Sequence, residues 1–245
     1  MVHYAKEAQI AECIEITTNA TLLNEKMNLG LIEAGIDILN ISVNGISEEQ
    51  YQEVCGCQLS FVEFREHIKH FYQMSRGKCK VFIKYGDIGY TKEQKNRFYD
   101  LFENICDEIF VEVISSTLWQ DTNIGNHIKN VHTGLYGHDL TGKSKQVCPF
   151  LFTTMVVNHQ GIAHLCCVDW KSEYQLGDLK TKSVSEIWNG MNLQKYQKLH
   201  LEKKKDLIPI CKNCECLSGH TLDDIDIYAE DIAKRIFKNS SGASS

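Results

Sequence analysis

The feature that most constrains the fold is an alternation of apolar, β-branched runs with amphipathic segments over the first 114 residues. Such runs are typical of buried strands, and they cover residues 13–18, 36–43, 79–84 and 108–114. Helical patterns lie between and around them, at residues 24–34, 47–54, 61–74 and 91–106. Strand and helix alternating in this way are typical of a parallel sheet or barrel. The sequence therefore predicts an α/β fold with about four βα units.

Polar residues lie at or just after the carboxyl ends of three of the predicted strands. They are Thr17 to Asn19, Ser42 with Asn44, and residues 84–87. A βα barrel places its chemistry at the carboxyl ends of its strands, so we expect a site along that edge. Each of these residues taken alone is equally well explained by a turn at the end of a strand.

A segment with a different sequence pattern begins at Cys148 and contains the cysteine spacing C-x17-C-x44-C-x2-C. Four thiolates suit zinc or an iron–sulfur cluster, since both prefer soft ligands. Zinc ribbons use two C-x2-C pairs, whereas only one is present, so we favour the cluster over zinc and over unrelated buried cysteines. Cys216 is a candidate substitute ligand, and Cys167 is expected on the opposite face of a strand from Cys166. The predicted ligands are Cys148, Cys166, Cys211 and Cys214.

The elements around these cysteines are predicted as follows. Residues 151–158 and 162–168 form a hairpin, and residues 183–200 form one helix with a capping box at Ser183 and Glu186. Trp188 is expected in the core, and a last helix covers residues 222–237.

Composition excludes some classes of function. The chain has a net charge of −6 and one short basic run at residues 203–205, so nucleic acid is not an expected partner. No apolar stretch approaches 18 residues, so we expect no membrane span. The first residues are too polar for a signal peptide, and eleven cysteines then indicate a reducing, cytoplasmic location.

The cysteine-containing segment resembles the auxiliary-cluster region of radical SAM proteins, which is called SPASM in its long form and twitch in its short form. The long form carries more cysteines after the C-x2-C pair, but this chain has only Cys216 there, and His220 occupies a position where another cysteine is expected. The resemblance therefore implies the twitch type, with one auxiliary [4Fe–4S] cluster. The matching residues are Cys148-Pro149, Gly161, Cys166 with Asp169, 176–179 and 187–189.

The first half resembles the third and fourth strands of a radical SAM barrel, at residues 16–25 and 37–45. The resemblance implies that Thr17 and Ser42 contact S-adenosylmethionine, with Lys80 as a further contact; Asn44 stands where relatives have aspartate. The C-x3-C-x2-C triplet that holds the catalytic cluster in this family is absent from the chain, and Cys55-Gly56-Cys57 is too tight to replace it.

We therefore expect an N-terminally incomplete radical SAM oxidoreductase or maturase that acts on a peptide or small molecule. The chain alone is expected to be inactive, with a separate N-terminal radical SAM piece as a candidate partner. A cluster-carrying binding module without catalysis and a structural zinc protein are the alternatives. The expected domains are a partial barrel and linker (1–147), the SPASM/twitch domain (148–217), and a C-terminal helix and tail (218–245).

Overall fold

The computed structural model describes two compact units. The described residues are 1–113, 145–212, 214, 217 and 223–237. Residues 1–113 belong to the first unit and the other described residues to the second. The predicted domain boundaries stay a prediction, because much of the predicted linker and residues 218–222 lie outside the described residues.

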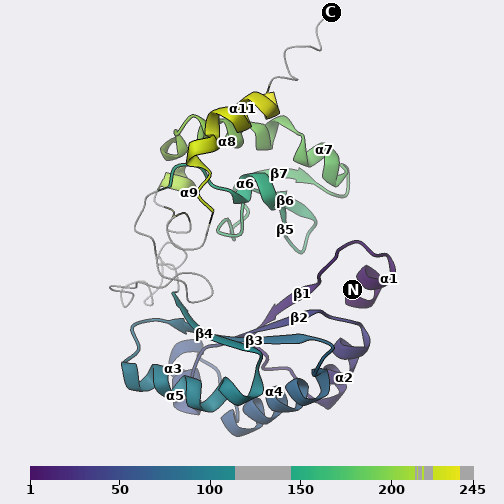
Figure 1. Ribbon diagram of the computed structural model, residues 1–245, viewed down its shortest axis with the longest axis vertical. Helices are drawn as coiled ribbons and strands as arrows, with labels where there is room; N and C mark the ends of the chain where they lie inside the picture. Colours follow the sequence, from purple (N-terminus) through teal and green to yellow (C-terminus); the bar gives the residue numbers. More distant parts are fainter. Residues whose placement is uncertain (114–144, 213, 215–216, 218–222, 238–245) are drawn as a thin grey trace, which may run out of the picture. The chain divides into compact units, whose positions relative to one another are not determined.

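A four-stranded parallel sheet forms the first unit (Figure 1). Its strand order follows the chain, so each βα unit adds one strand beside the last. All four predicted strands and the α/β class are confirmed. The strands are β1 (Glu15–Thr18), β2 (Ile38–Val43), β3 (Lys80–Asp87) and β4 (Glu108–Val113).

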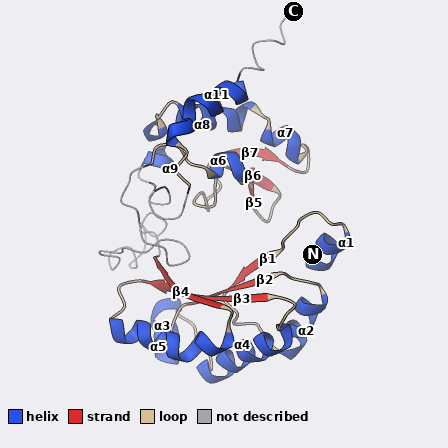
Figure 2. Cartoon of the chain, in the orientation of Figure 1, coloured by secondary structure: helices blue, strands red, loops and turns tan. Residues whose placement is uncertain are grey.

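Helices α2 to α5 cover one face of this sheet (Figure 2). Serine, threonine and asparagine side chains accept hydrogen bonds from the first helical N–H groups, which would otherwise lack partners. The capping residues are Asn24, Ser47, Ser60 and Thr91. The helices are α1 (Val2–Glu7), α2 (Glu25–Glu33), α3 (Glu48–Cys55), α4 (Phe61–Ser75) and α5 (Lys92–Phe102), and a 3-10 turn follows at Glu103–Ile105.

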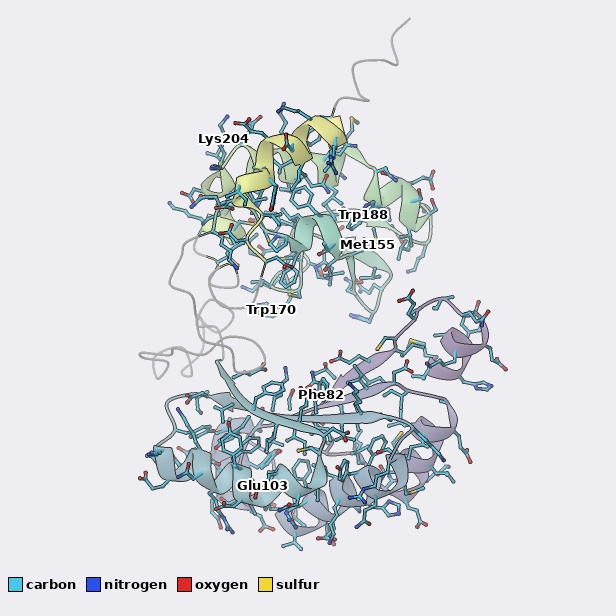
Figure 3. The ribbon with its side chains drawn as sticks, viewed as in Figure 1. Phe82, Glu103, Met155, Trp170, Trp188 and Lys204 are labelled. Carbon is cyan, nitrogen blue, oxygen red and sulfur yellow. The ribbon has the colours of Figure 1, made fainter. Side chains whose placement is uncertain are left out.

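The alternation of side chains along β2 and β3 separates an apolar face from a polar one. Ile41 and Ile83 are fully buried and belong to the core that packs against the helices. The alternate residues of each strand point to the other face of the sheet, where Figure 3 shows Phe82 away from the helices. Ser42 and Lys84 are paired in register on this second face, which therefore presents polar groups near the carboxyl ends of the strands.

A small antiparallel sheet forms the centre of the second unit, in the order β5 (Val156–Val157), β6 (Ile162–His164) and β7 (Gln175–Asp178). The predicted hairpin exists but is shorter than expected. Its first predicted strand begins as a helical turn, α6 (Phe150–Thr153), because Pro149 starts a helix readily and Leu151 N donates to Cys148 O at 3.3 Å.

The prediction of one helix over residues 183–200 is wrong, since the chain forms α7 (Val184–Trp188) and α8 (Met191–Leu201). The break lies at Gly190, whose extended backbone starts the second helix. A Cβ there would lie 3.0 Å from the carbonyl oxygen of Glu186, so the turn favours glycine. The capping box at Ser183 is confirmed, whereas Trp188 is only half-buried and Ile187 occupies the core.

The remaining elements are short. They are two 3-10 turns (Lys205–Leu207 and Asp226–Tyr228), α9 (Pro209–Lys212) and α11 (Ala229–Phe237). The last helix therefore begins later than predicted. Among the described residues, no helix is both long enough and apolar enough to cross a membrane.

Candidate metal centre

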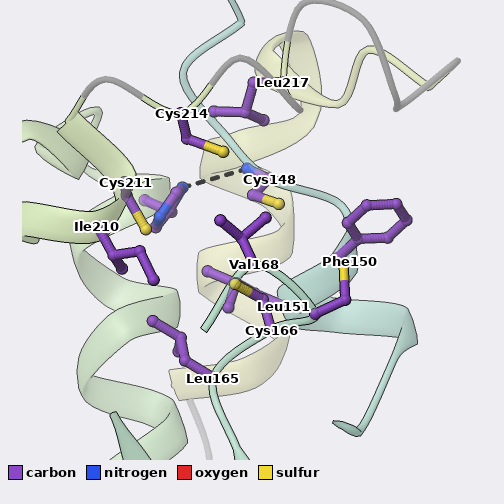
Figure 4. A pocket seen from close by; sticks show the side chains of 12 residues that line it. Cys148, Phe150, Leu151, Leu165, Cys166, Val168, Ile210, Cys211, Cys214 and Leu217 are labelled. Carbon is purple, nitrogen blue, oxygen red and sulfur yellow. Dashed lines mark hydrogen bonds between the residues drawn. The ribbon is translucent and has the colours of Figure 1, made fainter. Parts of the chain in front are cut away.

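One cavity of the second unit brings the four predicted cysteines together (Figure 4). Cys148 directly precedes the turn of α6, and Cys166 lies in the loop after β6. Cys211 is in α9 and Cys214 follows it. Three segments that are distant in sequence therefore meet at one place, as the spacing predicts.

Asp169 holds the loop that carries Cys166. Its buried carboxylate accepts from Glu173 N and Tyr174 N, each at 2.9 Å, and its own N–H donates to Cys166 O at 3.1 Å. His164 Nδ1 lies 3.6 Å from Asp169 Oδ2, and His164 is not among the residues that line the cavity. The aspartate in this part of the sequence pattern thus has a local structural role: it closes the loop.

Lys205 holds the C-x2-C segment. Its Nζ donates to Cys211 O at 3.4 Å and to Lys212 O at 3.2 Å, and the side chain is buried. Cys214 N donates to Cys211 O at 3.3 Å and completes the turn. No sequence signal marks Lys205, because a lysine in a run of three is ordinarily solvated.

Two helix residues and one aspartate hold the backbone next to Cys148. Asp226 accepts from Gln146 N and Val147 N at 2.9 and 2.8 Å. From α8, Gln197 Nε2 donates to Leu151 O at 2.9 Å, and His200 Nδ1 lies 3.2 Å from Cys148 N. No local sequence signal marks these contacts, which span 46 to 80 residues.

The cavity is apolar apart from its thiols and His200. Burial raises the pKa of Cys148 to about 11 and the pKa of Cys166 to about 12, and it also raises the pKa of Cys211. Binding of a metal must therefore displace protons from these thiols. The apolar lining residues are Phe150, Leu151, Leu165, Val168, Ile210 and Leu217.

Cys167 corrects one prediction. It lines the same cavity as Cys166 instead of pointing to the opposite side. The alternation rule applies to strands, whereas β6 ends at His164 and Cys167 lies in a turn. Cys216, the other candidate substitute ligand, lies outside the described residues.

The donor set fits an iron–sulfur cluster. Soft thiolates in an apolar shell are the ligands that such clusters take. Within the described ranges, no group of three or more histidine, cysteine, aspartate or glutamate side chains could hold a single metal ion. The thiols line one common cavity.

The three residues predicted to contact S-adenosylmethionine lie on the sheet of the first unit. Thr17 is paired with Asn40, and Ser42 with Lys84, near the carboxyl ends of their strands. Lys80 is exposed at the start of β3, which is the opposite end of the sheet.

Two polar pairs on this face were not predicted as pairs. Lys84 Nζ lies 2.7 Å from Glu112 Oε1, and both side chains are mostly buried. Asn40 Nδ2 donates to Glu15 Oε1 at 2.9 Å. Alternation of side chains along the strands could have indicated both pairs.

Residues 148–215 match the family model of the SPASM iron–sulfur cluster-binding domain. This part of the chain is similar to a SPASM domain. All four predicted ligands and the loop of Asp169 lie within the match.

Solved structures extend the comparison to most of the chain. BtrN in complex with AdoMet and 2-DOIA is 16% identical, with a TM-score of 0.51, over 92% of this chain and 69% of BtrN. Streptococcus suis SuiB bound to S-adenosylmethionine is 18% identical, with a TM-score of 0.54, over 79% of this chain and 51% of SuiB. Histidine-tagged anSMEcpe with bound AdoMet is 14% identical, with a TM-score of 0.51, over 92% of this chain and 70% of anSMEcpe. No curated protein matches the chain by sequence.

The SPASM match and the shared fold confirm the resemblance to radical SAM proteins with a SPASM domain. They also confirm the predicted architecture of a partial βα barrel followed by this small domain. The chain spans about half the length of SuiB and about two thirds of BtrN.

Proposed function

We propose that this SPASM domain holds one auxiliary [4Fe–4S] cluster and serves a radical SAM oxidoreductase or maturase. The observation that carries the proposal is the apolar cavity lined by thiols from three separate segments. The proposed ligands are Cys148, Cys166, Cys211 and Cys214.

The spacing of the cysteines favours a cluster over zinc. Zinc ribbons use two C-x2-C pairs, whereas this chain has one, and the other two thiols come from separate segments that line the same cavity.

When bound, the cluster supplies a one-electron redox centre. The residues of this chain hold it through deprotonated thiols and exclude water with the apolar lining. Four protein ligands leave no open iron for S-adenosylmethionine, so this centre assists chemistry that takes place elsewhere.

We propose that S-adenosylmethionine binds on the polar face of the parallel sheet. Thr17 and Ser42 lie near the strand ends where barrel sites form, and Lys84 and Glu112 add charged groups to the same face. Lys80 is a weaker candidate, since it lies at the other end of β3.

The substrate class stays between a peptide and a small molecule. BtrN was solved with 2-DOIA and SuiB with the precursor peptide SuiA. The chain contains no C-x3-C-x2-C triplet, so we propose that cleavage of S-adenosylmethionine depends on residues outside these 245, in the same polypeptide or in a partner. A cytoplasmic location is proposed from the cysteine-rich composition alone.

The test is the metal content of the chain purified without oxygen. About four iron and four sulfide per chain are expected, and Cys211→Ala with Cys214→Ala should abolish both. Cys13→Ala is the matched control, because Cys13 is exposed and lies in the other unit. About one zinc without sulfide would instead support a structural zinc protein.

A second measurement separates an enzyme from a binding module. The loaded chain is mixed with a radical SAM segment that carries the missing triplet, and formation of 5′-deoxyadenosine is measured. Product with the mixture and none with either part alone supports the enzyme; a stable complex without product supports the module.

A further inference from the structure

His200 is a fully buried histidine that lines the cysteine cavity without being a predicted ligand. It lies in the last turn of α8, within the second unit. Its two ring nitrogens have different surroundings, and this difference indicates what the residue does.

Nδ1 is turned toward the backbone beside Cys148. It lies 3.2 Å from Cys148 N, a contact drawn as the dashed line in Figure 4, and 3.1 Å from Gln146 O. One nitrogen of a neutral imidazole cannot both accept from the N–H and donate to the carbonyl. The tautomer that accepts from Cys148 N carries its proton on Nε2, and it is the tautomer that an acceptor inside the cavity would stabilise.

Nε2 is buried and has no hydrogen-bond partner among the described residues. A buried N–H without an acceptor is destabilising. His200 lines the cavity and its Nδ1 is engaged by the backbone, so Nε2 is the ring nitrogen left for a group inside the cavity. An acceptor inside the cavity would satisfy it.

We propose that His200 Nε2–H donates a hydrogen bond to a sulfur of the auxiliary cluster and thereby raises the reduction potential of that cluster. This inference rests on the proposed function. The acceptor is an inorganic sulfide or a cysteine thiolate, both of which bear negative charge.

The direction of the effect follows from electrostatics. Reduction adds an electron to the cluster, and a donated N–H stabilises the more negative state more strongly. Loss of the donor should therefore shift the potential to a more negative value. The backbone bond to Cys148 makes the same ring a positioning group for one ligand, so the two roles must be separated.

Two substitutions separate them. In His200→Asn the side-chain oxygen reaches the place of Nδ1 and keeps an acceptor for Cys148 N, but nothing reaches the place of Nε2. In His200→Gln the amide reaches farther and can donate near the position of Nε2. His159→Asn is the control, since His159 is exposed in the same unit.

The readout is a redox titration of the loaded full-length chain followed by electron paramagnetic resonance. We expect a more negative potential in His200→Asn, a smaller shift in His200→Gln, and none in His159→Asn. An unchanged potential in His200→Asn, or the same shift in both His200 variants, would overturn the donor role.

A measurement on the unaltered chain covers the case in which a variant loses its cluster. Electron–nuclear double resonance should detect a proton that couples to the reduced cluster and exchanges in D2O, and this proton should be absent from His200→Asn that still binds the cluster. Absence of the proton, or the strong nitrogen coupling of a coordinated imidazole, would overturn the inference while leaving the auxiliary cluster intact. Absence of any cluster from the unaltered chain would overturn the proposed function and this inference with it.

Discussion

Gly177 on β7 and Ile187 on α7 are in such close contact that a Cβ on the glycine would lie 2.8 Å from Ile187 Cγ1. The glycine lets the helix approach the small sheet, and Ile187 fills the core at this point. A methyl group here must displace a buried side chain or the helix itself.

Gly177→Ala should therefore destabilise the second unit by about 1–3 kcal/mol through overpacking. Tryptophan fluorescence during denaturation by urea measures this, because Trp170 and Trp188 both lie in that unit. Gly30→Ala is the control: Gly30 lies within α2 with nothing near its missing Cβ, so alanine should leave the second unit unchanged. Equal stability of Gly177→Ala and the unaltered chain would contradict the packing argument.

Lys205 supports the C-x2-C segment through its bonds to Cys211 O and Lys212 O. Lys205→Met keeps most of the side-chain volume and removes the donor, which should cost about 1–3 kcal/mol and lower the iron content of the loaded chain. Lys204→Met is the matched control, because Lys204 is exposed and pairs only with Glu202 among the described residues. Iron content that falls equally in both variants would show that the loss of positive charge, and not the bond to the backbone, is responsible.

His200 should make the stability of the cluster-free chain depend on pH. Burial lowers the pKa of His200 to about 4, below its ordinary value of 6.5. As the pH falls below 6.5 the unfolded chain takes up a proton that the folded chain refuses, so stability is complete above pH 6.5 and is lost progressively toward pH 4. The loss over this window is about 3 kcal/mol.

Urea denaturation at several pH values between 4 and 7 measures this loss. The profile of His200→Asn should be flatter by the same amount, since asparagine does not titrate. A variant profile parallel to that of the unaltered chain would assign the pH dependence to other groups.

The raised pKa values of the cavity thiols should make them unreactive in the cluster-free chain. With a pKa of about 11, Cys148 holds roughly 100-fold less thiolate near neutral pH than an ordinary thiol. Mass spectrometry after brief alkylation should find Cys13 modified long before Cys148 or Cys166, and the two cavity thiols should react faster as the pH rises. Simultaneous modification of all three would contradict the burial of the cavity.

Much of the first unit is predictable because its signals are local. The β-branched runs act within a few residues, and the four strands lie where the pattern indicates. The cap at Ser47 and the capping box at Thr91 are local contacts of the same kind. The break at Gly190 is not visible in the sequence because the apolar period continues across it, while the structure shows extended backbone at this residue.

The candidate site is predictable only in part, for the same reason. The cysteine spacing identifies the thiols that meet, but the groups that hold them belong to other segments. Lys205, Asp226 and His200 are an ordinary lysine, aspartate and histidine until the chain folds. Cys167 shows the converse, since a local rule for strands was applied to a residue that lies in a turn.

The two anchors that α8 provides to the Cys148 segment stand three residues apart, at Gln197 and His200. That spacing places them on one side of the helix. Inserting a single residue between them would rotate one anchor by about 100° around the helix axis and remove it from its partner. The rotational phase of Gln197 and His200 around the axis of α8 is therefore part of the cysteine site, although this helix contains no cysteine. An insertion into the exposed loop between β7 and α7, by contrast, would leave both anchors in phase.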